Sequence, residues 1–117
     1  MKNTTAPFGT QFSETMTLTR YSKGQWETPE AVPVAPLSLH PGAHVLHYSG
    51  TCFDGLKAFR MSDGEPKIFR LDYHLARFRQ SADLLCLPLP EPDVIEHMIR
   101  EAVKFGRSCM PEPPGAL

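Results

Sequence analysis

The stretch His47–Arg77, HYSGTCFDGLKAFRMSDGEPKIFRLDYHLAR, decides most of the predicted fold. Within it, residues 56–60 alternate between two faces, which is typical of a β-strand. The turn signal at residues 62–65 follows at once, since its Asp-Gly pair suits a backbone with positive φ. Residues 67–71 can then return as a second strand. The stretch therefore predicts a β-hairpin that leads into a helix.

That helix is predicted to begin at Asp72, whose carboxylate is placed to cap it. Its apolar residues recur at three- and four-residue spacing, the pattern of an amphipathic helix, and they are Leu75, Phe78, Ala82 and Leu85. Arg77 falls beside this stripe, so packing of the stripe does not require it. The helix should end near Cys86, because three prolines follow shortly afterwards.

A second amphipathic helix is predicted after these prolines. Pro92 suits its first position, where a missing N–H costs no hydrogen bond. Gly106 is the expected C-cap residue. The core stripe of this helix comprises Ile95, Met98, Ala102 and Phe105.

The N-terminal half carries shorter signals. Residues 8–20 have strand character, and residues 22–36 form a Pro-containing loop with a short extended piece at residues 31–32. Residues 43–48 are short, apolar and bounded by Gly, which predicts a buried strand or a turn. All these elements together indicate one α+β domain over residues 1–117, with a mainly antiparallel sheet and two amphipathic helices packed on it.

Composition limits the function. A formal net charge of −1 gives no electrostatic case for nucleic acid or an anionic membrane. No apolar run reaches the length of a membrane span, and the first residues lack a secretory signal. The three cysteines are widely spaced and odd in number, which argues against disulfides or a zinc site. We therefore expect a cytoplasmic protein.

Single residues leave several chemistries open. No sequence spacing typical of a metal site occurs, and the histidines at 40, 44 and 47 lack carboxylate partners. Lys57 could form a Schiff base, although a lysine in a strand is more often solvated or ion-paired. Arg77 could bind an anion, although most helix arginines are surface residues.

Several ordered motifs resemble the N-terminal part of the branched-chain aminotransferases, which are fold type IV pyridoxal-phosphate enzymes. These motifs are FGTQFSETM, LSLHPGAHVLHY, FDGLKAFR, IFRLDYHLARFRQSADLLCLP and PGAL. The resemblance extends from Phe8 to Leu117. It implies pyridoxal 5'-phosphate as cofactor, a homodimer, and transfer of the amino group of Leu, Ile or Val to 2-oxoglutarate.

The resemblance also implies a role for particular residues. Arg77 matches the arginine that contacts the cofactor phosphate, and Lys57 matches a basic residue at the pocket edge rather than the Schiff-base lysine. The expected substrate-pocket aromatics are Phe12, Tyr48 and Phe53. Asp54 stands where the family usually has Glu, and a shorter carboxylate is not expected to reach the same partner, so it is left out of this site.

In this family the Schiff-base lysine lies in a C-terminal domain that is absent from this chain. We therefore expect a fragment that is inactive alone, with no catalytic residue of its own. Two alternatives remain: another enzyme of the fold, such as a D-amino-acid aminotransferase or an aminodeoxychorismate lyase, and a non-catalytic interaction domain derived from such an enzyme. The motifs FDGLKAFR and LHPGAHVLHY favour the branched-chain aminotransferase over both alternatives.

Overall fold

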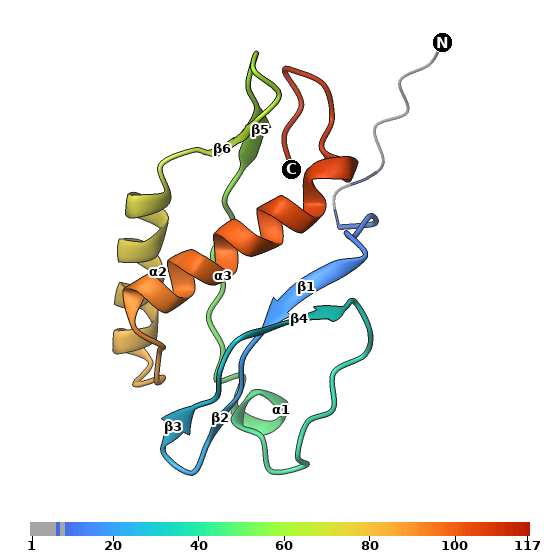
Figure 1. The fold of residues 1–117 in the computed structure, drawn as a ribbon. Helices are drawn as coiled ribbons and strands as arrows, with labels where there is room; N and C mark the ends of the chain where they lie inside the picture. The colour runs from blue at the N-terminus through green and yellow to red at the C-terminus, as the bar shows by residue number, and fades with distance from the viewer. Residues whose placement is uncertain (1–6, 8) are drawn as a thin grey trace.

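The computed structural model describes residues 7 and 9–117, so Phe8 and residues 1–6 lie outside the described part. The strands and helices of this part come in runs along the chain, with four strands, a short helix, two strands and then two longer helices, as expected for an α+β domain (Figure 1). In chain order they are β1 (Thr15–Leu18), β2 (Tyr21–Ser22), β3 (Gln25–Trp26), β4 (Glu30–Pro33), α1 (His44–Tyr48), β5 (Ala58–Arg60), β6 (Pro66–Ile68), α2 (Leu71–Leu84), α3 (Pro92–Phe105) and the 3₁₀ turn η1 (Gly106–Cys109). The predicted fold class is confirmed. None of the helices in this part is long and apolar enough to cross a membrane.

All strand pairs of the described residues are antiparallel, but they form three separate two-stranded ladders. β1 pairs with β4, β2 with β3, and β5 with β6. β1 also packs against α3, and the Thr17 hydroxyl donates a hydrogen bond to the Met98 carbonyl at 3.1 Å. The extended piece predicted at residues 31–32 lies inside β4, which confirms it.

The hairpin predicted at the centre of the chain is present as β5 and β6, with Gly64 at φ +82° in its turn. Its second strand is shorter than expected, because β6 ends at Ile68 and Leu71 already begins α2. The backbone of Ala58 exchanges two hydrogen bonds with Leu117, at 3.0 and 2.8 Å. β5 therefore has β6 on one side and the C-terminal residue on the other.

Both predicted helices form, with differences at their ends. The N-cap of α2 is Arg70 in a left-handed conformation, not Asp72, which lies in the first turn and makes no capping hydrogen bond. A carboxylate there complements the helix dipole instead. Leu85 lies just past the end of α2 and is exposed, so it does not extend the packed stripe as predicted. α3 begins at Pro92 and has Gly106 as C-cap, as predicted.

The segment 43–48 was predicted as a buried strand or a turn, and the strand prediction is wrong. Residues His44–Tyr48 form the short helix α1, which contains no buried residue and ends at Ser49 in a left-handed conformation. A strand needs a neighbour for its backbone groups, whereas a helical turn satisfies them locally. Local hydrogen bonding therefore decides the conformation of this segment.

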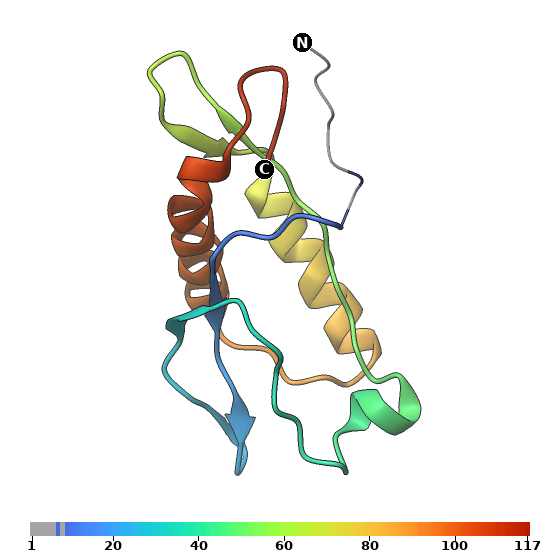
Figure 2. The ribbon, with the colours of Figure 1, turned by 90° about the vertical axis from the view of Figure 1, so that its right-hand side faces the viewer.

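The core is small for a chain of this length. The buried hydrophobic residues of the described part are Ala58, Leu71, Ala82, Val103 and Met110. The Cα radius of gyration is 15.9 Å, against roughly 13 Å for a compact chain of this length. α2 and α3 lie near each other, and the extended segment 49–57 runs along α2 (Figure 2). This segment carries the candidate site.

Candidate functional site

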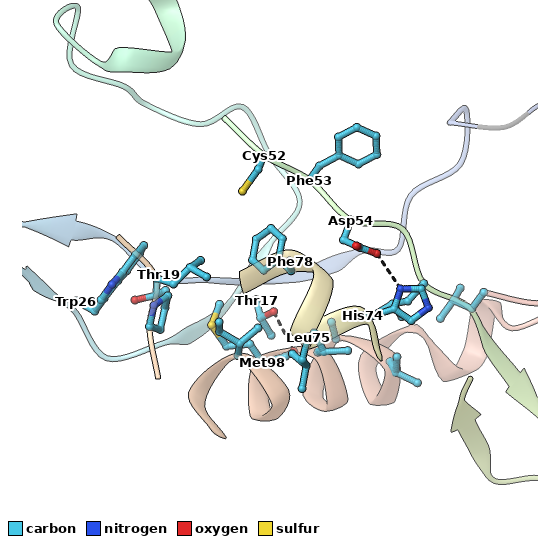
Figure 3. Close-up of a pocket in the computed structure, with 18 of the residues that line it drawn as sticks. Thr17, Thr19, Trp26, Cys52, Phe53, Asp54, His74, Leu75, Phe78 and Met98 are labelled. Atoms are coloured by element: carbon cyan, nitrogen blue, oxygen red, sulfur yellow. Dashed lines mark hydrogen bonds and ion pairs between the residues drawn. The ribbon is translucent and has the colours of Figure 1, made fainter. Parts of the chain in front are cut away.

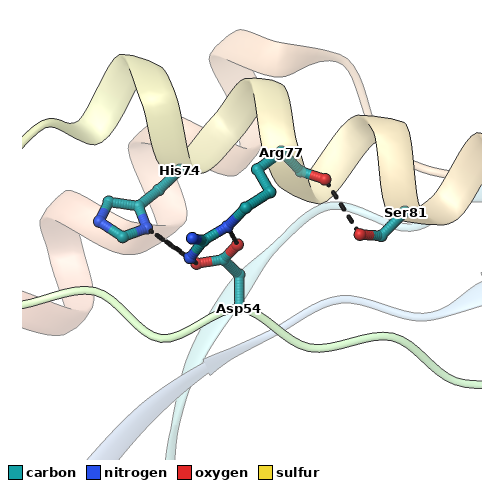
Figure 4. A network of polar contacts seen from close by, with 4 residues as sticks. All are labelled: Asp54, His74, Arg77 and Ser81. Atoms are coloured by element: carbon teal, nitrogen blue, oxygen red, sulfur yellow. Dashed lines mark hydrogen bonds and ion pairs between the residues drawn. The ribbon is translucent and has the colours of Figure 1, made fainter.

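Arg77 of α2 and Asp54 of the extended segment form a bidentate ion pair (Figure 4). The guanidinium Nε donates to Asp54 Oδ2 and Nη2 donates to Oδ1, both at 2.6 Å. Parallel hydrogen bonds between a guanidinium and a carboxylate are stronger than a single contact and fix the relative orientation of the two groups. The sequence reasoning left Asp54 out of the site because of its short side chain. The structure shows instead that Asp54 reaches Arg77.

His74, one turn before Arg77 on α2, supports the same carboxylate. Its Nδ1 lies 2.8 Å from Asp54 Oδ1, and because an ionised carboxylate only accepts, Nδ1 is the donor. The hydrogen bonds from Arg77 are the main cause that lowers the pKa of Asp54 from 3.8 to about 2, with burial opposing and His74 contributing. The same pair raises the pKa of Arg77. Asp54 is therefore an anion at physiological pH.

Asp54→Asn is expected to lower the free energy of unfolding at pH 7 by about 1 kcal/mol, because the charge-assisted pair is lost. The folded-state pKa of Asp54 is depressed, so its contribution exists above pH 3.8 and disappears as the pH falls toward about 2. The difference between variant and wild type should therefore shrink over this range. Urea unfolding midpoints between pH 7 and pH 2.5 measure it.

The matched control is Asp83→Asn, which removes the same charge from an exposed position of α2. This variant should leave the unfolding midpoint nearly unchanged at pH 7. If the difference in unfolding midpoint between Asp54→Asn and wild type increased as the pH was lowered, the stabilising role assigned to the ion pair would be contradicted.

Beside the ion pair lies an apolar groove of about 680 Å³ between β1, the extended segment, α2 and α3 (Figure 3). Asp54 and His74 contribute polar groups to its wall. Part of the predicted apolar stripe of each helix lines it, whereas Ala82, Leu85 and Phe105 do not. Its lining includes Thr17, Cys52, Phe53, Leu75, Phe78, Met98, Ala102 and Leu117.

The three predicted pocket aromatics come from separate segments and are strongly exposed. Phe53 is 91% exposed next to Asp54, Phe12 is 75% exposed before β1, and Tyr48 is 74% exposed at the end of α1. By contrast, Phe78 on the helix stripe is half-buried. The Tyr48 ring packs against His44, with centroids 4.8 Å apart.

Lys57 is exposed and directly precedes β5. Its carbonyl accepts a hydrogen bond from Phe69 at 2.9 Å, so the hairpin ladder fixes its backbone. In the part of the chain that the structure describes, no cluster of three His, Cys, Asp or Glu residues is arranged to hold a metal ion. Of the predicted site residues, the structure thus gives Arg77 an ordered polar environment and leaves the others as exposed side chains.

Comparison with known proteins identifies relatives over nearly the whole chain. A branched-chain-amino-acid aminotransferase of Dictyostelium discoideum is 35% identical over 109 residues, which are 92% of this chain and 29% of that protein. This chain is homologous to branched-chain-amino-acid aminotransferases. The cytosolic enzyme of that name from Saccharomyces cerevisiae is 35% identical over 115 residues, 97% of this chain and 30% of that protein. No family model matches the chain.

A bacterial relative of the same name has a similar sequence identity over a similar share of this chain. A Mycobacterium tuberculosis H37Rv branched-chain-amino-acid aminotransferase is 36% identical over 110 residues, 92% of this chain. The chain spans about 30% of the length of the curated relatives it matches. This extent is consistent with the N-terminal region that the motifs resemble.

Proposed function

We propose that residues 1–117 form the N-terminal small domain of a pyridoxal-phosphate-dependent branched-chain amino acid aminotransferase. The observation that carries this proposal is the match to such enzymes over 92% of the chain at 31–36% identity. The proposed reaction transfers the amino group of Leu, Ile or Val to 2-oxoglutarate. The partners are then a small amino acid, a 2-oxo acid and a second copy in a homodimer, in the cytoplasm.

The Arg77 environment fits the phosphate of this cofactor. Its side chain is 61% exposed although Asp54 holds one edge of the guanidinium. The remaining N–H donors suit a phosphate, since guanidinium groups bind phosphate oxygens through paired, charge-assisted hydrogen bonds. When bound, pyridoxal phosphate supplies the electron sink for the amino-group transfer. In this proposal Arg77 binds and orients its phosphate.

The exposed aromatics select the substrate in this proposal. Phe12, Tyr48 and Phe53 exclude water from an apolar side chain, which gains about 25 cal/mol for each Å² of apolar surface removed from water. Lys57 lies at the edge of that pocket and attracts a substrate carboxylate. The lysine that binds the cofactor covalently belongs, in this proposal, to a second domain that is not part of these 117 residues.

Transfer of this segment into a complete relative tests the proposal. Residues 15–117 replace the matching segment of the Saccharomyces cerevisiae cytosolic enzyme, and glutamate is measured after adding Leu, 2-oxoglutarate and pyridoxal phosphate. We expect the chimera to form glutamate, and the 117-residue chain alone to form none beyond the cofactor background. The reason is that the chain contributes binding groups but no proton-transferring lysine.

Two results would count against the proposal. One is a folded chimera that retains cofactor and forms no glutamate. The other is turnover by the 117-residue chain that Lys57→Ala abolishes, because Lys57 would then be the reactive lysine.

A further inference from the structure

We propose that Asp54 is a positioning residue, which holds the Arg77 guanidinium with one edge turned toward a phosphate monoester. The inference rests on the proposed function, since it takes Arg77 as the phosphate contact. It adds a role for Asp54, which neither the motif pattern nor the relatives' names assign.

The donors of Arg77 are divided between two edges of the guanidinium. Nε and Nη2 face Asp54, each with a hydrogen bond of 2.6 Å. Nη1 has no protein acceptor among the described residues, so its N–H groups stay available to an anion. Nη2 also lies 3.3 Å from His74 Nδ1, but this nitrogen donates to Asp54 and therefore does not accept from Nη2. A carboxylate on one edge and a phosphate on the other is a geometry that one planar guanidinium can satisfy at once.

The two side chains of the pair differ in their exposure to solvent. The Asp54 side chain is 11% exposed, whereas that of Arg77 is 61% exposed. The carboxylate therefore forms part of the wall and the guanidinium projects from it (Figure 4). An anion arriving from solvent meets Arg77 before it meets Asp54.

Asp54 is itself fixed, which a positioning residue requires. His74 donates to its Oδ1 at 2.8 Å, and His74 is on the same helix as Arg77. Ser81 donates from its hydroxyl to the Arg77 carbonyl at 3.1 Å, so backbone and side chain of Arg77 both have partners. The carboxylate thus receives donors from two positions one turn apart on α2, and it can orient a side chain that otherwise has many rotamers.

Two predictions for phosphate binding can be made for removal of the Asp54 charge, and they have opposite signs. A carboxylate repels a phosphate, so its neutralisation by substitution should tighten phosphate binding if Asp54 had no positioning role. If Asp54 positions Arg77, the same substitution weakens binding, because Arg77 must then lose its side-chain freedom when the anion binds. Whether Asp54→Asn tightens or weakens phosphate binding therefore shows whether Asp54 positions Arg77.

The experiment uses the 117-residue chain and pyridoxine 5'-phosphate, which has the phosphate but no aldehyde to react with lysines. Binding is measured by calorimetry for wild type, Asp54→Asn, Asp54→Glu, Arg77→Ala and Arg79→Ala. The Arg77 Nε–H signal is followed by NMR in the free chains. We expect Asp54→Asn to weaken binding about three- to tenfold and to speed Nε–H exchange toward that of free arginine, with Asp54→Glu restoring both.

The results separate the inference from the proposed function. Weaker binding in Arg77→Ala with equal or tighter binding in Asp54→Asn overturns the positioning role and leaves the phosphate contact intact. An Nε–H signal unchanged by Asp54→Asn also overturns the positioning role, whatever the binding result. If Arg77→Ala binds pyridoxine 5'-phosphate as tightly as wild type, Arg77 is not the phosphate contact. The proposal that Asp54 positions Arg77 toward a phosphate is then wrong as well.

Discussion

Arg77→Ala is expected to weaken binding of a pyridoxal-type phosphate by about 10- to 100-fold. The estimate follows from the loss of a hydrogen bond to a charged group, worth about 1.5–3 kcal/mol at 1.4 kcal/mol per decade of affinity. Arg77 lies outside the apolar stripe of α2 and is 61% exposed, so its truncation removes no core packing. Dissociation constants for pyridoxine 5'-phosphate measure the effect.

Three further variants make this result specific. Arg77→Lys should recover only part of the affinity, because it keeps the charge but loses the planar edge. Arg79→Ala should change little, since Arg79 is rotated by about 200° around the helix from Arg77. The double variant Asp54→Asn/Arg77→Ala should bind no more weakly than Arg77→Ala, because without Arg77 the carboxylate has no guanidinium to position and only repels the phosphate. A loss of folding stability in Arg77→Ala as large as a core truncation would favour a purely structural ion pair.

Ala58→Asp is expected to lower the free energy of unfolding by about 3 kcal/mol or more, because it buries an unpaired carboxylate. Ala58 is 1% exposed and forms the small core with Val103 and Met110, against which Ile68 packs. Its backbone also exchanges two hydrogen bonds with Leu117. The added side chain therefore disturbs the contact of β5 with α3. Urea unfolding monitored by circular dichroism measures the loss.

Ala31→Asp is the matched control, because Ala31 is also a strand alanine but lies exposed in β4. It should change the unfolding free energy by no more than about 0.5 kcal/mol. Equal effects of the two substitutions would show that the β5 region is not the core of the folded chain.

The ion pair shows where sequence reasoning fails on a candidate site. Arg77 could be singled out from its position in a motif, but Asp54 was set aside because its side chain is shorter than Glu. The two residues are 23 positions apart, and no local pattern states which carboxylate meets which guanidinium. The turn of α2 that carries both His74 and Arg77 brings two donors to Asp54, and only the packed chain shows this. A His-x-x-Arg spacing on one helix face was the available signal.

The sequence by itself determined the elements that depend on neighbouring residues. The α2 and α3 helices follow from apolar spacing bounded by prolines, and the β5–β6 hairpin follows from an Asp-Gly turn between alternating strands. These signals act within a few residues, so they need no tertiary context. The motifs also identified the aminotransferase relatives, because ordered matches accumulate along the chain.

Only the tertiary structure decided what depends on distant partners. It paired β1 with β4 and left Leu85 exposed beyond the end of α2. It also placed Asp54 against Arg77. The physical reason is the same in each case: burial, strand pairing and ion pairing are set by which segments meet in space, and local spacing does not contain that information.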